Sequence, residues 1–300
     1  MIENGVLAAI TGSHARSTER FADPMYTAVP GQHMQMFTHQ RLTMAVRRFG
    51  DGPLPLLAFH GFDRTGQDFA SIAPALDAHC TIHAFDLPFH GNSPAPAGKA
   101  PVSPGELADF ITAYAEQVPA ERVGLLGYSL GGRLALGLVE QCPQLMGPVF
   151  LAAPDGLVPR PWYRSMAHYR WGRWLYRRFI RHPGGTHALF SLLHRTGLLG
   201  DRMYHFLMGH TDTMEARALL HDTWTSFRLI EPDLERVAIN IRTERMAVHL
   251  LLGEYDRVIK PAFAERLKRL APNEVHVHLL PTGHRLLNAE LGKVIAGLIG

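Results

Sequence analysis

Apolar residues in this chain fall into short runs, separated by longer segments in which they recur at helical spacing. Residues 33–38 and 42–49 alternate apolar and polar side chains and are joined by a short polar link, which predicts an antiparallel hairpin. Continuous apolar runs predict buried strands, and these lie at 54–59, 81–85, 123–127, 148–153, 247–252 and 275–280.

The segments between these strands have the spacing of amphipathic helices. Phe69, Ile72 and Leu76 recur on one face of a helix predicted over 67–78. A capping box with proline at the first helical position begins another helix at Ser103. Further helices are predicted at 133–141, 261–270 and 285–299. Strands that alternate with helices are joined by right-handed crossovers, so we predict a doubly wound, mostly parallel α/β sheet. Ligands of such sheets bind beyond the C-terminal ends of the strands.

The alternation stops in the middle of the chain. Residues 157–243 are helical in pattern, rich in aromatic residues, methionine and arginine, and interrupt the predicted sheet between two core strands. Residues 1–30 mix small, polar and charged side chains without periodicity and are expected to form a loose arm. The predicted α/β core therefore comprises 31–156 and 244–300, with 157–243 as a helical insertion.

Composition narrows the class of protein. The chain has 300 residues, of which 46% are hydrophobic, so it can bury a large core. A formal net charge of +3 is too small to indicate a nucleic-acid partner by itself. Cys80 and Cys142 give no disulfide framework or metal spacing and are expected to be buried free thiols. No run has transmembrane length, and Glu3 replaces the basic start of a signal peptide, so a cytoplasmic location is expected.

The strand at 123–127 leads directly into the sequence Gly-Tyr-Ser-Leu-Gly-Gly, with the serine at position 129. A serine between glycines at a strand-to-helix junction has the pattern of a nucleophile elbow. Gly127 and Gly131 would let the two backbones approach closely, so that the Ser129 hydroxyl stands clear of the sheet. The helix that follows would direct the N–H of Leu130 at an oxyanion formed there.

Three more polar motifs follow the C-terminal ends of predicted strands. His60-Gly61-Phe62 follows the strand at 54–59, Asp256 follows the strand at 247–252, and His284 follows the strand at 275–280. The order Ser129, Asp256, His284 and these positions resemble the α/β-hydrolase superfamily, in particular its serine esterases and lipases with a helical cap. The resemblance runs from about residue 49 to the C-terminus, with a divergent middle.

The resemblance implies a role for each of these residues. Ser129 would attack an acyl carbon, His284 would act as its base, and Asp256 would orient and stabilise the imidazole. The backbone N–H of Phe62 would join that of Leu130 in the oxyanion hole. Asp155, after the preceding core strand, is a rival for the acid, and Glu254 lies near Asp256 in the sequence. His60 is expected to be a structural histidine of its loop.

Another turn resembles the superfamily only in part. Asp86, Gly91 and Ser93 match the turn after the second core strand, but Phe89 stands where the family commonly has glycine. Phe89, Tyr128 and Trp162 are candidates for contact with the substrate. No residue pattern indicates a nucleotide, metal or flavin site, so no cofactor or metal is expected.

The expected substrate is a small acyl compound with an apolar acyl or alkyl part, because the insertion is rich in aromatic residues. Carboxylic esters are the first choice among the bonds that such a triad cleaves. Thioesters, including those of an acyl carrier protein, amides and the carbon–carbon bonds of diketones are alternatives. A ligand-binding receptor on the same fold is a further alternative, and the oligomeric state is open.

The insertion contains one stretch of unusual charge. No acidic residue lies between Asp155 and Asp201, while arginines gather in the first part of this stretch. At about 100° per residue, one helical face would carry Arg170, Arg173, Arg177 and Arg181. The opposite face would carry Trp171, Leu175, Tyr176, Phe179 and Ile180. A solvated arginine face above a core-facing aromatic face is the simplest expectation. Weak contact with an anionic membrane surface or an acidic acyl carrier is the alternative.

Overall fold

The fold is described for most of the 300 residues by a computed structural model. The described residues are 34–159, 167–181, 183–201, 204, 208, 209, 211 and 213–299. The expected N-terminal arm and Trp162 lie outside them. Within these ranges, no helix is both long enough and apolar enough to cross a membrane.

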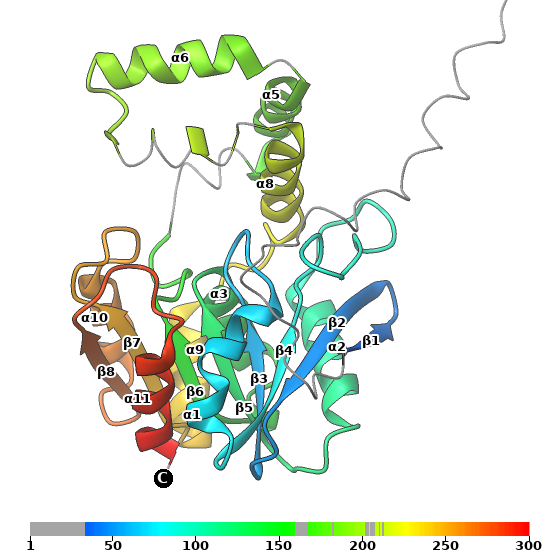
Figure 1. The fold of residues 1–300 in the computed structure, drawn as a ribbon, viewed down its shortest axis with the longest axis vertical. Helices are drawn as coiled ribbons and strands as arrows, with labels where there is room; N and C mark the ends of the chain where they lie inside the picture. The colour runs from blue at the N-terminus through cyan, green and yellow to red at the C-terminus, as the bar shows by residue number, and fades with distance from the viewer. Residues whose placement is uncertain are drawn as a thin grey trace, which may run out of the picture. The chain divides into compact units, whose positions relative to one another are not determined.

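One eight-stranded sheet forms the centre of the fold, in the order β1-β2-β4-β3-β5-β6-β7-β8 (Figure 1). Its strands are β1 (Met34–His39), β2 (Leu42–Phe49), β3 (Leu54–Phe59), β4 (Cys80–Phe85), β5 (Val123–Tyr128), β6 (Met146–Ala152), β7 (Val248–Gly253) and β8 (Val275–Leu280). β2 is antiparallel to β1 and to β4, and all other neighbours are parallel. The predicted hairpin and the predicted doubly wound, mostly parallel sheet are therefore confirmed.

Helices cover both faces of this sheet. They are α1 (Ala73–Leu76), α2 (Pro104–Ala115), α3 (Leu130–Gln141), α9 (Leu234–Glu244), α10 (Glu265–Leu270) and α11 (Ala289–Ile299), with short 3₁₀ turns η1 (Gly66–Ser71), η2 (Pro143–Leu145) and η3 (Pro261–Ala264). α1 packs on α11, and Figure 1 shows the two together on one face. α3 packs against α2 and α9. The capping box predicted at Ser103 is present at the start of α2.

The helix predicted over 67–78 is split into η1 and α1. Pro74 has no N–H to donate to the preceding turn, and its ring crowds that turn. The chain therefore makes a 3₁₀ turn first and begins a new helix beside the proline.

Helices also fill the described part of the segment between β6 and β7. They are α5 (Arg170–Arg181), α6 (Pro183–Arg195), α8 (Met214–Ser226) and α9. α9 packs on α3 and α10 and so flanks the sheet, although the sequence pattern grouped it with the insertion. α5 packs against α6 and α8 instead of the sheet. Trp171 and Leu175 remain 57% and 45% exposed, so the expectation of a core-facing aromatic side is wrong for these two residues.

The register of the sheet aligns the ends of the parallel strands. Phe59 of β3 lies opposite Phe85 of β4 and Gly127 of β5. Farther along, Tyr128 lies opposite Ala152 of β6, which lies opposite Leu251 of β7. The loops that leave these strands therefore meet at one edge. Cys80 and Cys142 are buried free thiols, as expected.

Candidate active site

Ser129 lies on a sharp turn between β5 and α3. Its φ of 51° and ψ of −112° place a non-glycine residue in a sparsely populated region, which costs about 1–3 kcal/mol and is typical of functional sites. A Cβ on Gly131 would lie 1.9 Å from the carbonyl oxygen of Phe59, and one on Gly127 would lie 2.6 Å from the Cα of Gly132. Both glycines are therefore required by close backbone approach. Leu130 begins α3, so its N–H is among those that find no partner inside the helix.

His284 bridges Ser129 and Asp256. Its Nδ1–H donates to Oδ2 of Asp256 over 2.8 Å, and its Nε2 lies 3.2 Å from Oγ of Ser129. A proton held on Nδ1 leaves Nε2 as an acceptor for the serine hydroxyl. The N–H of Glu254 donates to the carbonyl of Leu280 at the end of β8, and the N–H of Tyr255 donates to that of Thr282, which ties the loop of Asp256 to the loop of His284.

Asp256 is held in its charged form. Its side chain is fully buried, and its Oδ1 accepts hydrogen bonds from the N–H groups of Val258, at 2.7 Å, and Ile259, at 3.0 Å. Burial alone would raise the pKa of this carboxyl, but the hydrogen bonds from His284, Ile259 and Val258 outweigh it and lower the pKa. A carboxylate in this position orients the imidazole and stabilises its protonated form.

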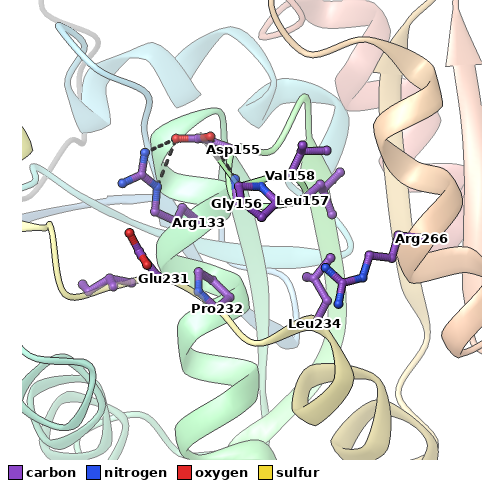
Figure 2. Close-up of a pocket in the computed structure, with 11 residues that line it drawn as sticks. Arg133, Asp155, Gly156, Leu157, Val158, Glu231, Pro232, Leu234 and Arg266 are labelled. Carbon is purple, nitrogen blue, oxygen red and sulfur yellow. Dashed lines mark hydrogen bonds and ion pairs between the residues drawn. The ribbon is translucent and has the colours of Figure 1, made fainter. Parts of the chain in front are cut away.

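The rival acid, Asp155, has a different partner. Figure 2 shows its carboxylate directed at the guanidinium of Arg133, and the Nε of that arginine lies 3.0 Å from Oδ2. Oδ1 accepts the N–H of Gly156 at 2.9 Å. Both side chains of this ion pair are largely buried. Glu254, the other nearby acid, is exposed.

The loop after β3 passes next to Ser129. A Cβ on Gly61 would lie 3.2 Å from the Cβ of Ser129 and 3.1 Å from the ring of Tyr128. Phe62 follows directly, so its backbone belongs to the same close approach. The loop that carries Phe62 is therefore beside the serine, which is where an oxyanion donor is needed.

Two buried histidines connect this loop to the loop after β4, and sequence reasoning identified only the first. Nε2 of His60 accepts the N–H of Leu87 at 2.9 Å, and Nε2 of His90 accepts the N–H of Asp63 at 3.2 Å. Their Nδ1–H groups donate to Gly61 O and Pro88 O. Burial lowers the pKa of both imidazoles. Both rings must be neutral, because a protonated Nε2 could not accept these bonds.

Asp86, which the sequence placed in the turn after β4, fixes the same two loops through its carboxylate. Its Oδ1 accepts from Arg47 at 2.6 Å and from the N–H of Gly66 at 2.7 Å. Its Oδ2 accepts the N–H of Asn92 at 2.8 Å. Arg47 and Gly66 come from β2 and η1, so their spacing in the sequence gives no sign of these two contacts, whereas Asn92 lies in the same turn as Asp86.

The candidate substrate contacts lie in different places. The hydroxyl of Tyr128 donates to the carbonyl of His284 at 2.9 Å, so Tyr128 supports the histidine loop. Phe89 adopts a φ of +71°, the backbone region for which the family commonly uses glycine. Trp162 lies outside the described residues. Leu220 of α8 is buried against Phe62, Phe190 and Trp224 in an apolar cluster beside the expected oxyanion loop.

No group of three or more histidine, cysteine, aspartate or glutamate side chains is placed to hold a metal ion within the part of the chain that the structure describes.

Known proteins match this chain over most of its length. It is 26% identical over 235 residues to YugF, an uncharacterized hydrolase of Bacillus subtilis, which covers 78% of this chain and 84% of YugF. A pimeloyl-[acyl-carrier protein] methyl ester esterase of Aeromonas hydrophila is 34% identical over 129 residues, covering 40% of this chain and about half, 48%, of the esterase.

Solved structures share the fold. A thermophilic esterase of Thermogutta terrifontis aligns with a TM-score of 0.60 and 17% identity, over 89% of this chain and 96% of the esterase. A putative epoxide hydrolase of Pseudomonas aeruginosa aligns with a TM-score of 0.61 and 19% identity, over 91% of this chain and 97% of the epoxide hydrolase chain. The model of the alpha/beta hydrolase family matches residues 56–296. This chain, with an eight-stranded sheet and motifs at the ends of its strands, therefore belongs to the alpha/beta hydrolase family.

Proposed function

We propose that this hydrolase is a serine esterase that cleaves carboxylic esters through an acyl-enzyme, with Ser129, His284 and Asp256 as its triad. The observation that carries this proposal is the position of His284, which bonds Asp256 through Nδ1 and faces the Ser129 hydroxyl through Nε2. Such an arrangement gives the serine a base and gives the base an orienting carboxylate.

The reaction follows from these contacts. Oγ of Ser129 attacks the ester carbonyl while its proton passes to Nε2 of His284. The N–H groups of Leu130 and Phe62 donate to the oxyanion of the tetrahedral intermediate. The intermediate collapses to an acyl-serine, and the imidazolium gives its proton to the leaving alcohol. Water then attacks the acyl-serine with His284 again as base, which releases the acid and restores the serine.

The preferred acyl group is apolar. Phe62, the expected oxyanion donor, packs with Leu220, Phe190 and Trp224, so the space next to the reacting carbonyl has an apolar wall. Three of these four residues belong to the segment between β6 and β7, which acts as a cap over the site. Apolar walls of this kind favour alkyl chains over charged groups at the acyl position.

The choice of esters over other acyl compounds is supported by the relatives. The Aeromonas relative is named as a methyl ester esterase, and a structural neighbour is named as an esterase. A thioester or an amide differs from an ester only in its leaving group, so the same residues could act on it. The relative rates on matched compounds decide between these classes.

A panel of matched substrates tests the proposal. p-Nitrophenyl esters, thioesters and anilides of graded acyl length are compared by kcat/KM. We expect the esters to be fastest, with kcat/KM rising from acetyl to medium-chain acyl groups as the apolar wall is filled. Hydrolysis of the thioesters alone would reassign the substrate class. Labelling by a fluorophosphonate without hydrolysis of any compound would favour a ligand-binding receptor.

A further inference from the structure

A basic groove lies between the loop after β4 and helices α5 and α8. It has a volume of about 500 Å³ and does not include the triad. Its charged lining, in the part of the chain that the structure describes, consists of Lys99 from the loop, Arg173 and Arg177 from α5, and Asp222 and Arg228 from α8 and its C-terminal end. Phe89 supplies an apolar patch. The volume is that of a site for a small organic molecule rather than a single ion.

Positive charge dominates this groove. Among the described residues that line it, four cationic side chains from three separate segments accompany one carboxylate, that of Asp222, whose Oδ1 lies 2.8 Å from Nδ1 of His221. Arg173 donates to the carbonyls of Ala167 and His168. Lys99 and Arg177 make no hydrogen bond or ion pair with another residue in the described ranges. Cations brought together in one groove repel one another, and an anion relieves that repulsion.

The wall that carries Lys99 is held rigidly. Arg41 donates to the carbonyls of Ala100, at 2.9 Å, and Pro101, at 2.6 Å, and it pairs with Glu106. This hydrogen-bonded pair raises the pKa of Arg41 and lowers that of Glu106 to about 2, so both stay charged. The N–H of Val102 donates to the carbonyl of Ser226 at 2.8 Å, which joins the loop to α8. A groove whose walls are fixed in advance binds a ligand with a smaller loss of entropy.

The groove is next to the proposed acyl site. One side of α8 places Leu220 and Trp224 in the cluster with Phe62, while His221, Asp222 and Thr225 of the same helix line the groove. On the other wall, Phe89 precedes His90, whose imidazole accepts the N–H of Asp63 in the oxyanion loop. One substrate could therefore place its ester at Ser129 and another part of its structure in the groove.

We propose that the groove binds a phosphate group of the substrate, so that this esterase acts on phosphorylated esters of small molecules; this inference rests on the proposed function. Arginine and lysine are the usual partners of phosphate, and several of them suit a group that carries up to two negative charges. The apolar cluster takes the acyl chain and the basic groove takes the phosphorylated part of the leaving alcohol.

A matched pair of esters tests this inference. Butyrylglycerol 3-phosphate and butyrylglycerol differ only in the phosphate. We expect the wild type to have a kcat/KM about tenfold or more higher for the phosphorylated ester at low salt, through a lower KM, because hydrogen bonds between charged groups are stronger than those between neutral groups. The preference should shrink as salt is added.

Two charge-matched variants give the control. Lys99→Gln/Arg177→Gln removes two groove cations, and Arg178→Gln/Arg195→Gln removes two exposed arginines outside the groove. Lys99→Gln/Arg177→Gln should lose the preference for the phosphorylated ester while keeping its activity on butyrylglycerol. Arg178→Gln/Arg195→Gln should keep both the preference and the activity. An equal loss of this preference in the two variants would overturn the inference. So would a wild type that hydrolyses the two esters with equal kcat/KM.

Calorimetric titration with glycerol 3-phosphate separates this inference from the proposed chemistry, because this ligand contains no carboxylic ester for the triad to cleave. Binding by the wild type and by Arg178→Gln/Arg195→Gln, with at least tenfold weaker binding by Lys99→Gln/Arg177→Gln, would support the groove even if no ester were hydrolysed. Equal binding by all three proteins would contradict it.

Discussion

Asp256 and Asp155 are both carboxylates that follow core strands, but their partners assign them different roles. Asp256 accepts the imidazole N–H of His284, so Asp256→Asn should lower kcat/KM by about 10³- to 10⁴-fold, because an amide cannot stabilise the imidazolium and favours the wrong tautomer. The measurement is steady-state kinetics on a p-nitrophenyl ester, with the unfolding midpoint of the variant as a check that it folds.

Asp155→Asn is the matched control. It weakens the buried ion pair with Arg133 and should lower the free energy of unfolding by about 1–3 kcal/mol. Turnover per folded molecule should stay within a few-fold of the wild type, because Asp155 does not contact His284 in the described structure. Loss of turnover in this variant, with Asp256→Asn still active, would move the acid to the end of β6.

The sequence predicts the role of a single residue where that role depends on its neighbours in the chain. The elbow at Ser129 requires glycines at fixed positions, and those positions are visible in the sequence. The ion pair of Arg133 with Asp155 and the partners of Asp86 join residues from different elements. No local pattern encodes such contacts, because side chains far apart in the chain meet only once the sheet has formed.

Single helices and strands were predicted well where apolar periodicity was long and uninterrupted. β8 has its predicted bounds, and α2 begins at its predicted cap. The failures have physical causes: Pro74 splits the helix predicted over 67–78, and α5 packs on other helices instead of the sheet. An amphipathic pattern shows which side chains share a face but not what that face contacts.

The end of α9 provides a test at this scale. Arg245 follows the helix with φ of 52° and ψ of 41°, and the N–H of Met246 donates to the carbonyl of Ile241. This left-handed position favours glycine, so Arg245→Gly should raise the free energy of unfolding by about 1 kcal/mol. The midpoint of urea unfolding measures the change. A lower midpoint would mean that the exposed arginine side chain contributes more than the backbone strain costs.

Buried histidines should make the stability of the whole molecule depend on pH. Burial lowers the pKa of His83 and His249 to about 4, from an ordinary value of 6.5, and it also lowers the pKa of His60 and His90. Between about pH 7.5, where unfolded imidazoles begin to bind protons, and about pH 4, the unfolded chain therefore binds more protons than the folded chain, and stability falls as the pH falls. Above about pH 7.5, these groups are neutral in both states and contribute almost no slope.

Urea unfolding at about pH 8.5, 7.5 and 5 checks this expectation. The midpoint should be nearly equal at the first two values and clearly lower at the third. His249→Gln should show a smaller loss at pH 5, because it removes one of the imidazoles whose pKa the folded structure lowers. A midpoint that is independent of pH over this range would show that these histidines titrate normally in the folded protein.

The topology of the whole molecule was predictable because strands alternate with helices, and the handedness of crossovers then determines which strand ends meet.

The basic groove was not predictable. The arginine pattern suggested one face with Arg170, Arg173, Arg177 and Arg181, whereas Arg173 and Arg177 line the groove with Lys99 and Arg228. Those partners come from other segments, and only their packing brings the charges together.

The central claim is that Ser129 forms the acyl-enzyme. Reaction with a fluorophosphonate, followed by intact mass measurement and peptide mapping, tests this most directly. The wild type should gain one adduct, located on Ser129, in proportion to its loss of esterase activity. Ser129→Ala should gain none and should lose at least about 10⁴-fold in kcat. An adduct on another residue, or an alanine variant with wild-type turnover, would contradict the account.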